Sequence, residues 1–470
     1  MEPMKDRYDV IVIGGGPAGS TCAALLARNG HDVLLLERHK FPRFHIGESI
    51  TAFGFHAFKD LGVYDELKSM NYVQKKGLEF VMREGNKKVY FPSDLINEPG
   101  ELPWAFQMHR AKLDHVLLKN ARAKGATVLE ERLVKQVIFE NGRAVGVEVK
   151  DLSEGSSDEI RRVDARWVVD ASGQGAILNR QLEDNWADDP LLEKKIAVYS
   201  HFKGVDIVNS DDELNFKLCV HENRRDWAWW LPIEKDVVSL GVVLSQETLK
   251  NETKTKDLEA IFYKYAADIP HIDKLVQDPN VQRIEKFRCG KDYSYRAKRF
   301  FGPGWALVGD SGGFIDPIFS TGMQIAFNSS ISLAEHLDKA LRSDPVDERE
   351  LAAYQKKYDE FYRFNSMLVY LFYLAKLDYR NLSNGRYLWK NVEWAGLWQR
   401  LKFIFYGQII IRTNPKKVSK WGEQVLFGNP GPDNLLAKFL LMLSENYDKV
   451  SRRKENRTKF APTNTELVEA

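Results

Sequence analysis

Glycines near the N-terminus have the types and spacing to bind a phosphate group. They form the pattern G-x-G-x-x-G at Gly14, Gly16 and Gly19. The first glycine allows a tight turn, the second lets a pyrophosphate approach the backbone, and the third lets a helix pack closely on a strand. Glu37 follows about 20 residues later, where a carboxylate can hold ribose hydroxyls. These residues predict a dinucleotide site, and a purely structural turn is the alternative.

Regular elements must hold this turn in place. An apolar run at 9–13 predicts a buried strand, and the pattern at 17–29 predicts a helix that ends before Gly30. A second strand is expected at 33–36, directly before the acid. The start of such a helix has unpaired N–H groups and a partial positive charge, which attract phosphate. The order strand, turn, helix, strand and acid therefore supports the dinucleotide interpretation.

Two later predicted strands also end in acidic residues. The strand at 162–169 runs into Asp170, and the strand at 305–308 runs into Gly309 and Asp310. A carboxylate that follows a glycine at the end of such a strand can reach the ribityl hydroxyls of a flavin. A simple nicotinamide site has no use for such a carboxylate. The glycine turn near the N-terminus and the Gly309-Asp310 pair together therefore predict FAD.

A polar, cationic loop follows the first acid. Residues 38–49 contain Pro42 and Gly47, which interrupt regular structure. Because the loop comes directly after the strand that carries the ribose-binding acid, it can line the edge of the cofactor. A solvated basic loop is the alternative.

The composition excludes several classes of protein. The chain has 470 residues, 44% of them hydrophobic, and a net charge of +2, so it can bury a large core and has no basic surplus for nucleic acid. Its three cysteines have neither metal-ligand nor disulfide spacing, so we expect a reducing, cytoplasmic location. We also expect no signal peptide and no transmembrane segment, because no apolar run approaches the ~18 residues that a spanning helix needs.

The order of the patterns predicts an α/β fold with a divided nucleotide-binding domain, at 1–185 and 285–345. Antiparallel strand patterns predict an inserted, substrate-side sheet domain at 186–284. Residues 346–445 are expected to form a helical C-terminal region, and 446–470 a charged, disordered tail. Asn141 and Gly142 indicate a hairpin turn. Further helices are expected at 50–72, 108–123, 253–267 and 322–341.

Taken together, these features resemble the flavin-dependent halogenases of the glutathione-reductase-like monooxygenase superfamily, over about residues 9–341. The matching segments are 14–19, 41–49, 227–232 and 309–322. The resemblance implies an FAD-binding, glutathione-reductase-like Rossmann domain. The cofactor-binding residues it implies are Gly14, Gly16, Ala18, Gly19, Glu37, Arg43, Ile46, Gly47, Glu48, Ser49, Arg110, Asp170, Gly309 and Asp310.

The most specific match is the stretch W-A-W-W-L-P at 227–232. In the family, such tryptophans keep the organic substrate away from the flavin, so Trp227, Trp229 and Pro232 are expected to border a tunnel. Without the resemblance, the tryptophans of a strand can equally be core or a stacking face.

The start of the helix at 322–341 is the expected halide site. Backbone N–H groups at a helix N-terminus attract anions. The resemblance implies that Ser320, Thr321 and Gly322 hold chloride or bromide there. Capping of the helix by Ser320 or Thr321 is the ordinary alternative, and both can be true at once.

The spacing of Lys75 before Gly77 resembles that of the family's active-site lysine. That amine receives hypohalous acid, by a hydrogen bond or as a chloramine. Lys76 leaves the register open, and an exposed lysine is the alternative. Phe319 stands where tryptophan halogenases carry Glu, which favours a phenol or pyrrole over tryptophan as substrate.

The resemblance implies a sequence of steps. A partner flavin reductase supplies FADH2, O2 converts it to a C4a-hydroperoxide, and halide attacks the distal oxygen. Hypohalous acid then passes the tryptophans to Lys75, and a small electron-rich aromatic, free or on a carrier protein, is halogenated.

Three alternatives remain open on the sequence alone. The first is an FAD-dependent monooxygenase or polyprenyl-type reductase of the same fold. The second is a non-catalytic flavin-binding module. The third is a membrane-associated enzyme whose residues 403–406 dip into lipid, against which a buried helix over the substrate pocket is the plainer interpretation.

Overall fold

A computed structural model describes most of the chain up to residue 374. The described residues are 4–50, 53–81, 87–90, 105–189, 192–205, 207, 216–221, 225–252, 256–290, 294–343 and 345–374. The contacts divide the chain into two compact units: Met1–Ala187 with Lys194–Asp359, and Asp188–Glu193 with Glu360–Ala470. The expectations for 375–470, which include the later C-terminal helices and the charged tail, lie outside the described residues. The two large sheets found among the described residues both belong to the first unit.

The first sheet carries the glycine turn. Its strands run in the order β20-β21-β11-β1-β2-β8, with β10 paired to β11 and β9 to β10. Strand β1 is parallel to β2 and β11, and β11 is parallel to β21, so their carboxyl ends meet at one edge. Ligands bind at such an edge in open α/β sheets. The strands are β1 (Arg7–Ile13), β2 (Val33–Leu36), β8 (Thr127–Leu129), β9 (Arg132–Glu140), β10 (Arg143–Asp151), β11 (Ile160–Asp170), β20 (Phe301–Gly302) and β21 (Trp305–Leu307).

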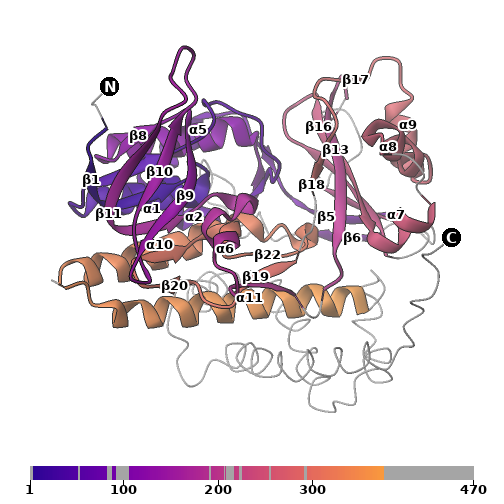
Figure 1. Cartoon of the computed structure of the whole chain (residues 1–470). Helices are drawn as coiled ribbons and strands as arrows, with labels where there is room; N and C mark the ends of the chain where they lie inside the picture. Colours follow the sequence, from indigo (N-terminus) through magenta and orange to yellow (C-terminus); the bar gives the residue numbers. More distant parts are fainter. Residues whose placement is uncertain are drawn as a thin grey trace, which may run out of the picture. The chain divides into compact units, whose positions relative to one another are not determined.

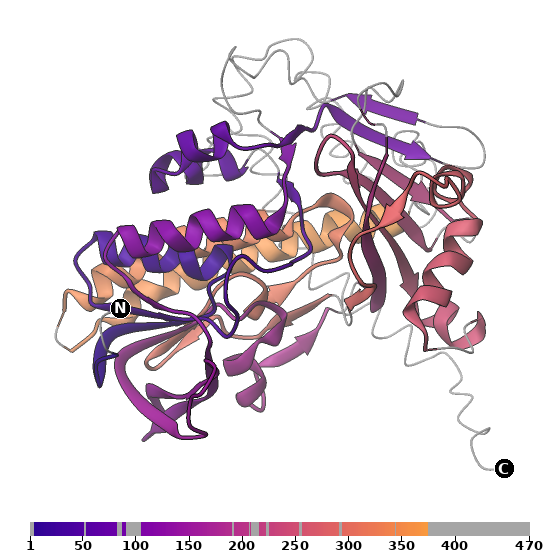
Figure 2. The same ribbon diagram turned by 90° about the horizontal axis from the view of Figure 1, so that it is seen from above.

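Three helices pack side by side along this sheet, as Figure 2 shows: α5 (Arg110–Ala123), α1 (Pro17–Arg28) and α10 (Gly322–Leu341). Helix α1 lies in contact with both of the others. The Oγ of Ser330 in α10 donates a hydrogen bond to the carbonyl of Ala18 in α1 at 2.9 Å. This contact fixes the start of α1 against α10, which both begin at the carboxyl edge of the sheet.

The second sheet is mostly antiparallel, and helices cover one of its faces (Figure 1). Its order is β17-β13-β16-β15-β14-β5-β6, with β18 paired to β13. Strand β5 joins in parallel to β14, so residues before the predicted insertion complete this sheet. The strands are β5 (Gly77–Val81), β6 (Lys87–Tyr90), β13 (Lys195–Lys203), β14 (Lys217–Val220), β15 (Trp227–Pro232), β16 (Val237–Ser245), β17 (Gln282–Arg283) and β18 (Arg288–Gly290).

The two faces of β15 serve different purposes. Ala228 and Trp230 belong to a core formed with α8 (Leu258–Ala267) and α9 (Pro270–Val276). Trp227 and Trp229 point to the opposite face, because side chains alternate along a strand. Three strands of the second sheet, β5, β6 and β18, lie outside the predicted insertion at 186–284. The predicted division of this unit into two domains stays a prediction.

Smaller elements complete the described structure. They are β3 (Ser49–Ile50), β4 (Val73–Gln74) and β7 (Phe106–Gln107) in one small sheet, β12 (Trp186–Asp188), β19 (Tyr295–Ala297) and β22 (Gly313–Phe314) in another, and the helices α2 (Phe53–Leu61), α3 (Tyr64–Ser69), α6 (Ile177–Gln181), α7 (Gln246–Glu252) and α11 (Leu351–Leu374). Short 3-10 helices lie at Gly173–Gly175, Gly309–Ser311, Pro317–Phe319 and Glu348–Glu350. Within the described part of the chain, every helix falls short of the length or apolar character that crossing a bilayer requires.

Two of the predicted helices were wrong in extent. The helix expected at 50–72 is interrupted at Gly62, whose φ of 76° ends α2 before α3 begins. The helix expected at 253–267 begins only at Leu258, after Asp257, whose side chain accepts a hydrogen bond from the N–H of Glu259. The helices at 17–29, 108–123 and 322–341 are confirmed to within two residues.

A missing side chain at Gly241 makes room for Trp229. The two residues face each other across β15 and β16, and a Cβ at position 241 would lie 2.2 Å from the indole ring. We therefore expect Gly241→Ala to lower the free energy of unfolding by about 1–3 kcal/mol, because overpacking forces the ring to move. Denaturant unfolding and tryptophan emission measure the loss and the movement. The double variant with Trp229→Leu should regain part of the stability, and an unchanged stability in the single variant would contradict this packing.

Candidate functional site

A cavity of about 550 Å³ lies where the carboxyl edge of the first sheet meets the second sheet. Most of the site residues expected from the sequence line it. These are Gly14, Gly16, Ala18, Glu37, Arg43, Ile46, Gly47, Glu48, Ser49, Arg110, Trp227, Trp229, Asp310, Ser320 and Gly322. Segments that are hundreds of residues apart in the sequence therefore contribute to one site.

The glycine turn leaves the start of α1 open to an anion. Gly14 has φ 101°, and a Cβ at Gly19 would lie 1.9 Å from the carbonyl oxygen of Gly14, so only glycine fits at both positions. No side chain caps α1, and its first turn holds no acid. Arg43 lies close to Gly16 and adds a positive charge. This end of the cavity suits a diphosphate.

Backbone N–H groups hold the carboxylate of Glu37 next to the glycine turn. Its carboxylate accepts hydrogen bonds from the N–H of Gly15 at 2.7 Å and of His39 at 2.8 Å. The backbone thus fixes the carboxylate at the end of β2, at the place where ribose hydroxyls were expected to bind.

Arg110 braces the loop at 38–49. Its guanidinium donates to the carbonyls of Ile46 at 2.8 Å and Gly47 at 3.3 Å, and to the carboxylate of Asp114. Arg43 also pairs with Asp114, at 3.0 Å. Burial raises the pKa of Asp114, but Arg110 and Arg43 lower it further than burial raises it, so this buried carboxyl stays ionised.

Asp170 and Asp310, both expected to contact the cofactor, have different environments. The carboxylate of Asp170 accepts from the N–H of Ser172 at 2.9 Å and of Leu178 at 2.8 Å, and Asp170 is not among the residues that line the cavity. Its oxygens therefore hold the segment that follows β11, and the expected direct contact with the cofactor stays a prediction. Asp310 lines the cavity, and burial raises its pKa to about 7, an effect that Arg110 opposes.

The aromatic wall is formed by one face of β15. Trp227, Trp229 and Leu231 line the cavity, and Tyr199 of β13 packs against Trp229 with ring centroids 5.9 Å apart. Pro232 is not among the residues that line the cavity, and alternation along the strand places it on the other face, with Ala228 and Trp230. Leu231 therefore takes the place in the wall that was expected for Pro232.

The expected halide site lies at the start of α10. Ser320 has φ 57°, and Thr321 is the N-cap residue but makes no side-chain capping bond. The Oγ1 of Thr321 is buried and has no hydrogen-bond partner. Capping by Thr321 is thus not observed, and a buried hydroxyl remains beside the free N–H groups of the helix. Gly309 packs closely against the start of α1, because a Cβ added at this position would lie 2.9 Å from the Cβ of Ala18.

Lys75 is buried next to the cavity, with only 5% of its surface exposed. Its Nζ donates to the Oγ of Ser49 at 3.0 Å and lies 4.3 Å from the centre of the Phe216 ring, and both partners line the cavity. Burial lowers the pKa of Lys75 to about 7. Lys76 is exposed. The alternative of an exposed lysine at position 75 is therefore wrong. Of the two neighbouring lysines, Lys75 is the one whose amine lies next to the cavity.

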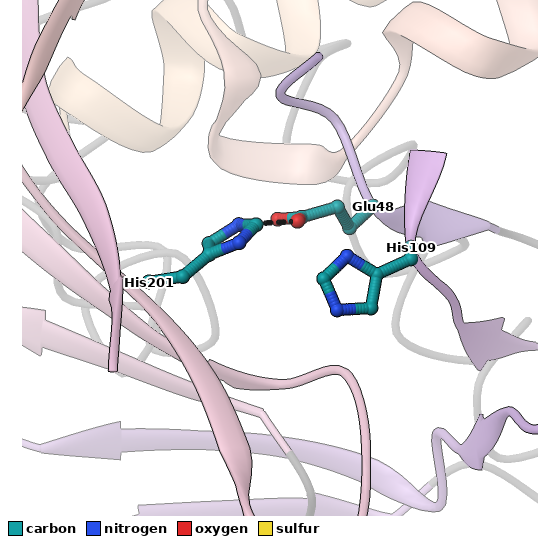
Figure 3. Close-up of side chains that lie close together, drawn as sticks. All are labelled: Glu48, His109 and His201. Carbon is teal, nitrogen blue, oxygen red and sulfur yellow. Dashed lines mark ion pairs between the residues drawn. The ribbon is translucent and has the colours of Figure 1, made fainter. Parts of the chain in front are cut away.

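Several residues of the second sheet were not predicted to belong to the site. Tyr199, Phe216 and Arg288 line the cavity, and His201 lies behind Phe44 of the loop, with ring centroids 5.0 Å apart. Figure 3 shows His201 close to Glu48 and His109. The sequence signal for this group is a histidine within the otherwise mostly apolar strand β13, which lies inside the predicted sheet domain at 186–284.

Comparisons with known proteins agree with this geometry. The family model described as tryptophan halogenase matches residues 73–393, and one described as an NAD(P)-binding Rossmann-like domain matches 12–71. The chain is 32% identical to a 1H-pyrrole-2-carbonyl-(peptidyl-carrier protein) brominase of Pseudoalteromonas luteoviolacea, over 71% of this chain and 78% of that protein. It is 30% identical to a flavin-dependent halogenase of Acremonium egyptiacum, over 77% of this chain and 67% of that protein.

Solved structures show the same fold. A flavin-dependent brominase superposes with a TM-score of 0.72 at 24% identity, covering 94% of this chain and 100% of that one. The myxobacterial chondrochloren halogenase, described as FAD-dependent, gives 0.69 at 27% identity, with 94% and 97% covered. The chain therefore belongs to the tryptophan halogenase family and is an FAD-dependent halogenase.

Proposed function

We propose that this enzyme chlorinates or brominates an electron-rich aromatic ring of phenol or pyrrole type, free or tethered to a carrier protein. A separate flavin reductase delivers FADH2 to it. The observation that carries the proposal is the buried amine of Lys75, which lies next to the cavity. The same cavity is lined by Trp227 and Trp229 and by Asp310, the acid expected to contact the flavin.

The residues of the cavity fit FAD. The uncapped start of α1 and Arg43 suit its diphosphate, and the fixed carboxylate of Glu37 suits its adenosine ribose. Asp310 faces the cavity from the end of β21 and suits the ribityl hydroxyls. When bound, reduced FAD supplies the activation of O2, and the protein supplies binding and orientation.

The start of α10 is the proposed halide site. Thr321 and Gly322 carry backbone N–H groups at the N-terminus of a 20-residue helix, where the helix dipole favours an anion. The buried, unpaired hydroxyl of Thr321 is a further donor for a halide.

The aromatic wall and Lys75 have separate roles: the wall keeps the organic substrate from the flavin, and the amine accepts the halogen. Trp227 and Trp229 fill one side of the cavity, so they keep an organic ring from the flavin while a small hypohalous acid passes. A lysine with a pKa of about 7 is partly neutral at neutral pH, and its amine can accept the halogen. The amine and hypohalous acid give a haloamine and water. The aromatic ring then takes the halogen from nitrogen and loses a proton, and the amine is restored.

Phe319 and one relative support the proposed substrate class. Phe319 precedes the halide site in place of the glutamate expected for tryptophan. One relative is named as a brominase of a pyrrole-2-carbonyl group on a carrier protein. Electron-rich rings of this kind react with a mild halogen donor without further activation.

Exchange of the buried acid should separate cofactor binding from stability. We expect Asp310→Asn to weaken the binding of oxidised FAD about tenfold or more, because a hydrogen bond to a charged group is lost, as measured by quenching of flavin fluorescence. The pKa of Asp310 is about 7 when folded and 3.8 when unfolded, so its ionisation opposes folding above pH 7 and not below pH 4. The flavin-free variant should therefore melt higher than wild type at pH 8.

Asp170→Asn serves as the matched control for this exchange. Burial raises the pKa of Asp170, as it does for Asp310, but each of its two carboxylate oxygens accepts a backbone N–H group. An asparagine has one acceptor oxygen and leaves one of these buried N–H groups unpaired, so the variant should melt lower than wild type. If both variants melt lower at pH 8 and bind FAD equally well, the roles given to the two acids are reversed or absent.

Removal of the lysine amine should abolish halogenation and raise stability. The pKa of Lys75 is about 7 when folded and 10.5 when unfolded, so the folded protein carries the full cost of a buried ammonium below pH 7, and none above pH 10.5. We expect Lys75→Met to reduce product formation at least about 100-fold and to raise the melting temperature, most clearly at pH 6. Lys76→Met, at the exposed neighbour, should change neither quantity. A Lys75→Met enzyme that halogenates as fast as wild type would refute the assigned role.

The identity of the reaction can be tested by product mass. Purified enzyme receives FADH2 from a reductase, O2, and either bromide or chloride, with a panel of phenols, pyrroles and indoles. We expect a phenol or pyrrole product whose mass spectrum carries the isotope pattern of the halide supplied. Products that gain oxygen instead, with either halide, would indicate a monooxygenase.

A further inference from the structure

Three side chains that bind metals elsewhere meet beside the cavity. Glu48 comes from the end of the loop at 38–49, His109 from the residue before α5, and His201 from the middle of β13. One ligand atom from each lies within 4.8 Å of the others. Figure 3 shows the Glu48 carboxylate pointing at the His201 ring, with the His109 ring beside it. Among the described residues, this is the one group of three or more His, Cys, Asp or Glu side chains with such spacing.

The buried polar atoms of Glu48 and His201 make no hydrogen bond. Glu48 and His201 are each 1% exposed. Both oxygens of Glu48 and both ring nitrogens of His201 are buried without a hydrogen bond. The Oε1 of Glu48 and the Nε2 of His201 form an ion pair at 2.6 Å, but the two atoms are not aligned for a hydrogen bond. Buried polar atoms are normally paired, because leaving them bare costs free energy. A bound ion or molecule that contacts both Glu48 and His201 would satisfy these buried atoms.

His109 is oriented as metal-bound histidines are. Its Nε2 lies 3.6 Å from Glu234, whose carboxylate is held by Lys112 at 2.5 Å. The other ring nitrogen faces Glu48 (Figure 3). A histidine that binds a metal through one nitrogen usually directs the other to a carboxylate, carbonyl or water.

We propose that Glu48, His109 and His201 bind one divalent transition-metal ion, of which Zn²⁺ is the best-fitting probe. Two imidazoles and one carboxylate are the donors that Zn²⁺ and its neighbours prefer, whereas Mg²⁺ and Ca²⁺ prefer oxygen ligands alone. The three ligands leave one position for water. Ligands about 2.0–2.2 Å from an ion lie about 3 Å or more apart, so Glu48 and His201 must separate by a few tenths of an ångström.

The proposed ion connects parts that are distant in sequence. Glu48 also lines the cavity, and its carbonyl accepts a hydrogen bond from the N–H of Met108 at 3.1 Å. The ion would link the loop at 38–49 and the start of α5 to the second sheet at β13. Its role is to hold this wall of the cavity, and it does not depend on the reaction proposed above.

The metal content of the full-length protein, loaded with oxidised FAD, tests the proposal. The protein is equilibrated with Zn²⁺, freed of unbound metal and measured by mass spectrometry of the element. We expect about one Zn²⁺ per chain in wild type, and at least a tenfold lower affinity in His201→Ala and Glu48→Gln. Substitution with Co²⁺ should give visible absorption bands in wild type that both variants lack.

His31→Ala is the matched control. His31 also forms a close pair with a carboxylate, at 2.8 Å from Asp338, but it is not part of a group of three. This variant should keep the Zn²⁺ of wild type. If His201→Ala fails to fold, His109→Ala replaces it, because that side chain is 22% exposed and easier to truncate. Zn²⁺ binding by Glu48→Gln and His109→Ala equal to that of wild type would overturn the proposal, as would a wild type that binds none. Neither result bears on halogenation, which is measured separately.

Discussion

The parallel alignment of β1, β2, β11 and β21 determines where everything else in the site can lie. Because these strands point the same way, the glycine turn, Glu37, the loop after Asp170, and Asp310 all emerge at one edge. The close approach of α1 to this edge requires glycine at positions 14 and 19. Helix α10 starts at the same edge and brings its N-terminus to the cavity. One alignment thus brings the proposed diphosphate, ribityl and halide sites to the same edge.

The charges around the cavity fall into two classes. Arg110 and Asp114 are buried but paired, and together they fix the loop at 38–49. Asp310 and Lys75 are buried in surroundings that disfavour their charged forms, as the direction of both pKa shifts indicates. Shifts of this kind are common at functional sites, because stability is lost there in exchange for reactivity. The paired charges hold the scaffold, and the proposed chemistry falls to Asp310 and Lys75. Burial also raises the pKa of Asp170, whose carboxylate instead accepts backbone N–H groups.

Much of this arrangement could be predicted from the sequence because its signals are local. The glycine spacing, the apolar runs and the Asn141-Gly142 turn, with φ 50° and 78°, each act within a few residues. The direction of Asp170 could not be predicted, since it depends on backbone N–H groups that the following loop presents. Leu231 was predictable in principle, because period-two alternation places it with Trp227 and Trp229. His201 could not be assigned to Glu48 and His109 because tertiary structure alone brings them together.

The central claim is that the flavin and the lysine amine occupy separate sides of an aromatic wall. A crystal structure with FAD and bromide, measured with the anomalous signal of bromine, tests it most directly. We expect a bromide peak at the N–H groups of Thr321 and Gly322, and the rings of Trp227 and Trp229 between the isoalloxazine and the Nζ of Lys75. An isoalloxazine in direct contact with the space around Lys75, or bromide bound only elsewhere, would contradict it.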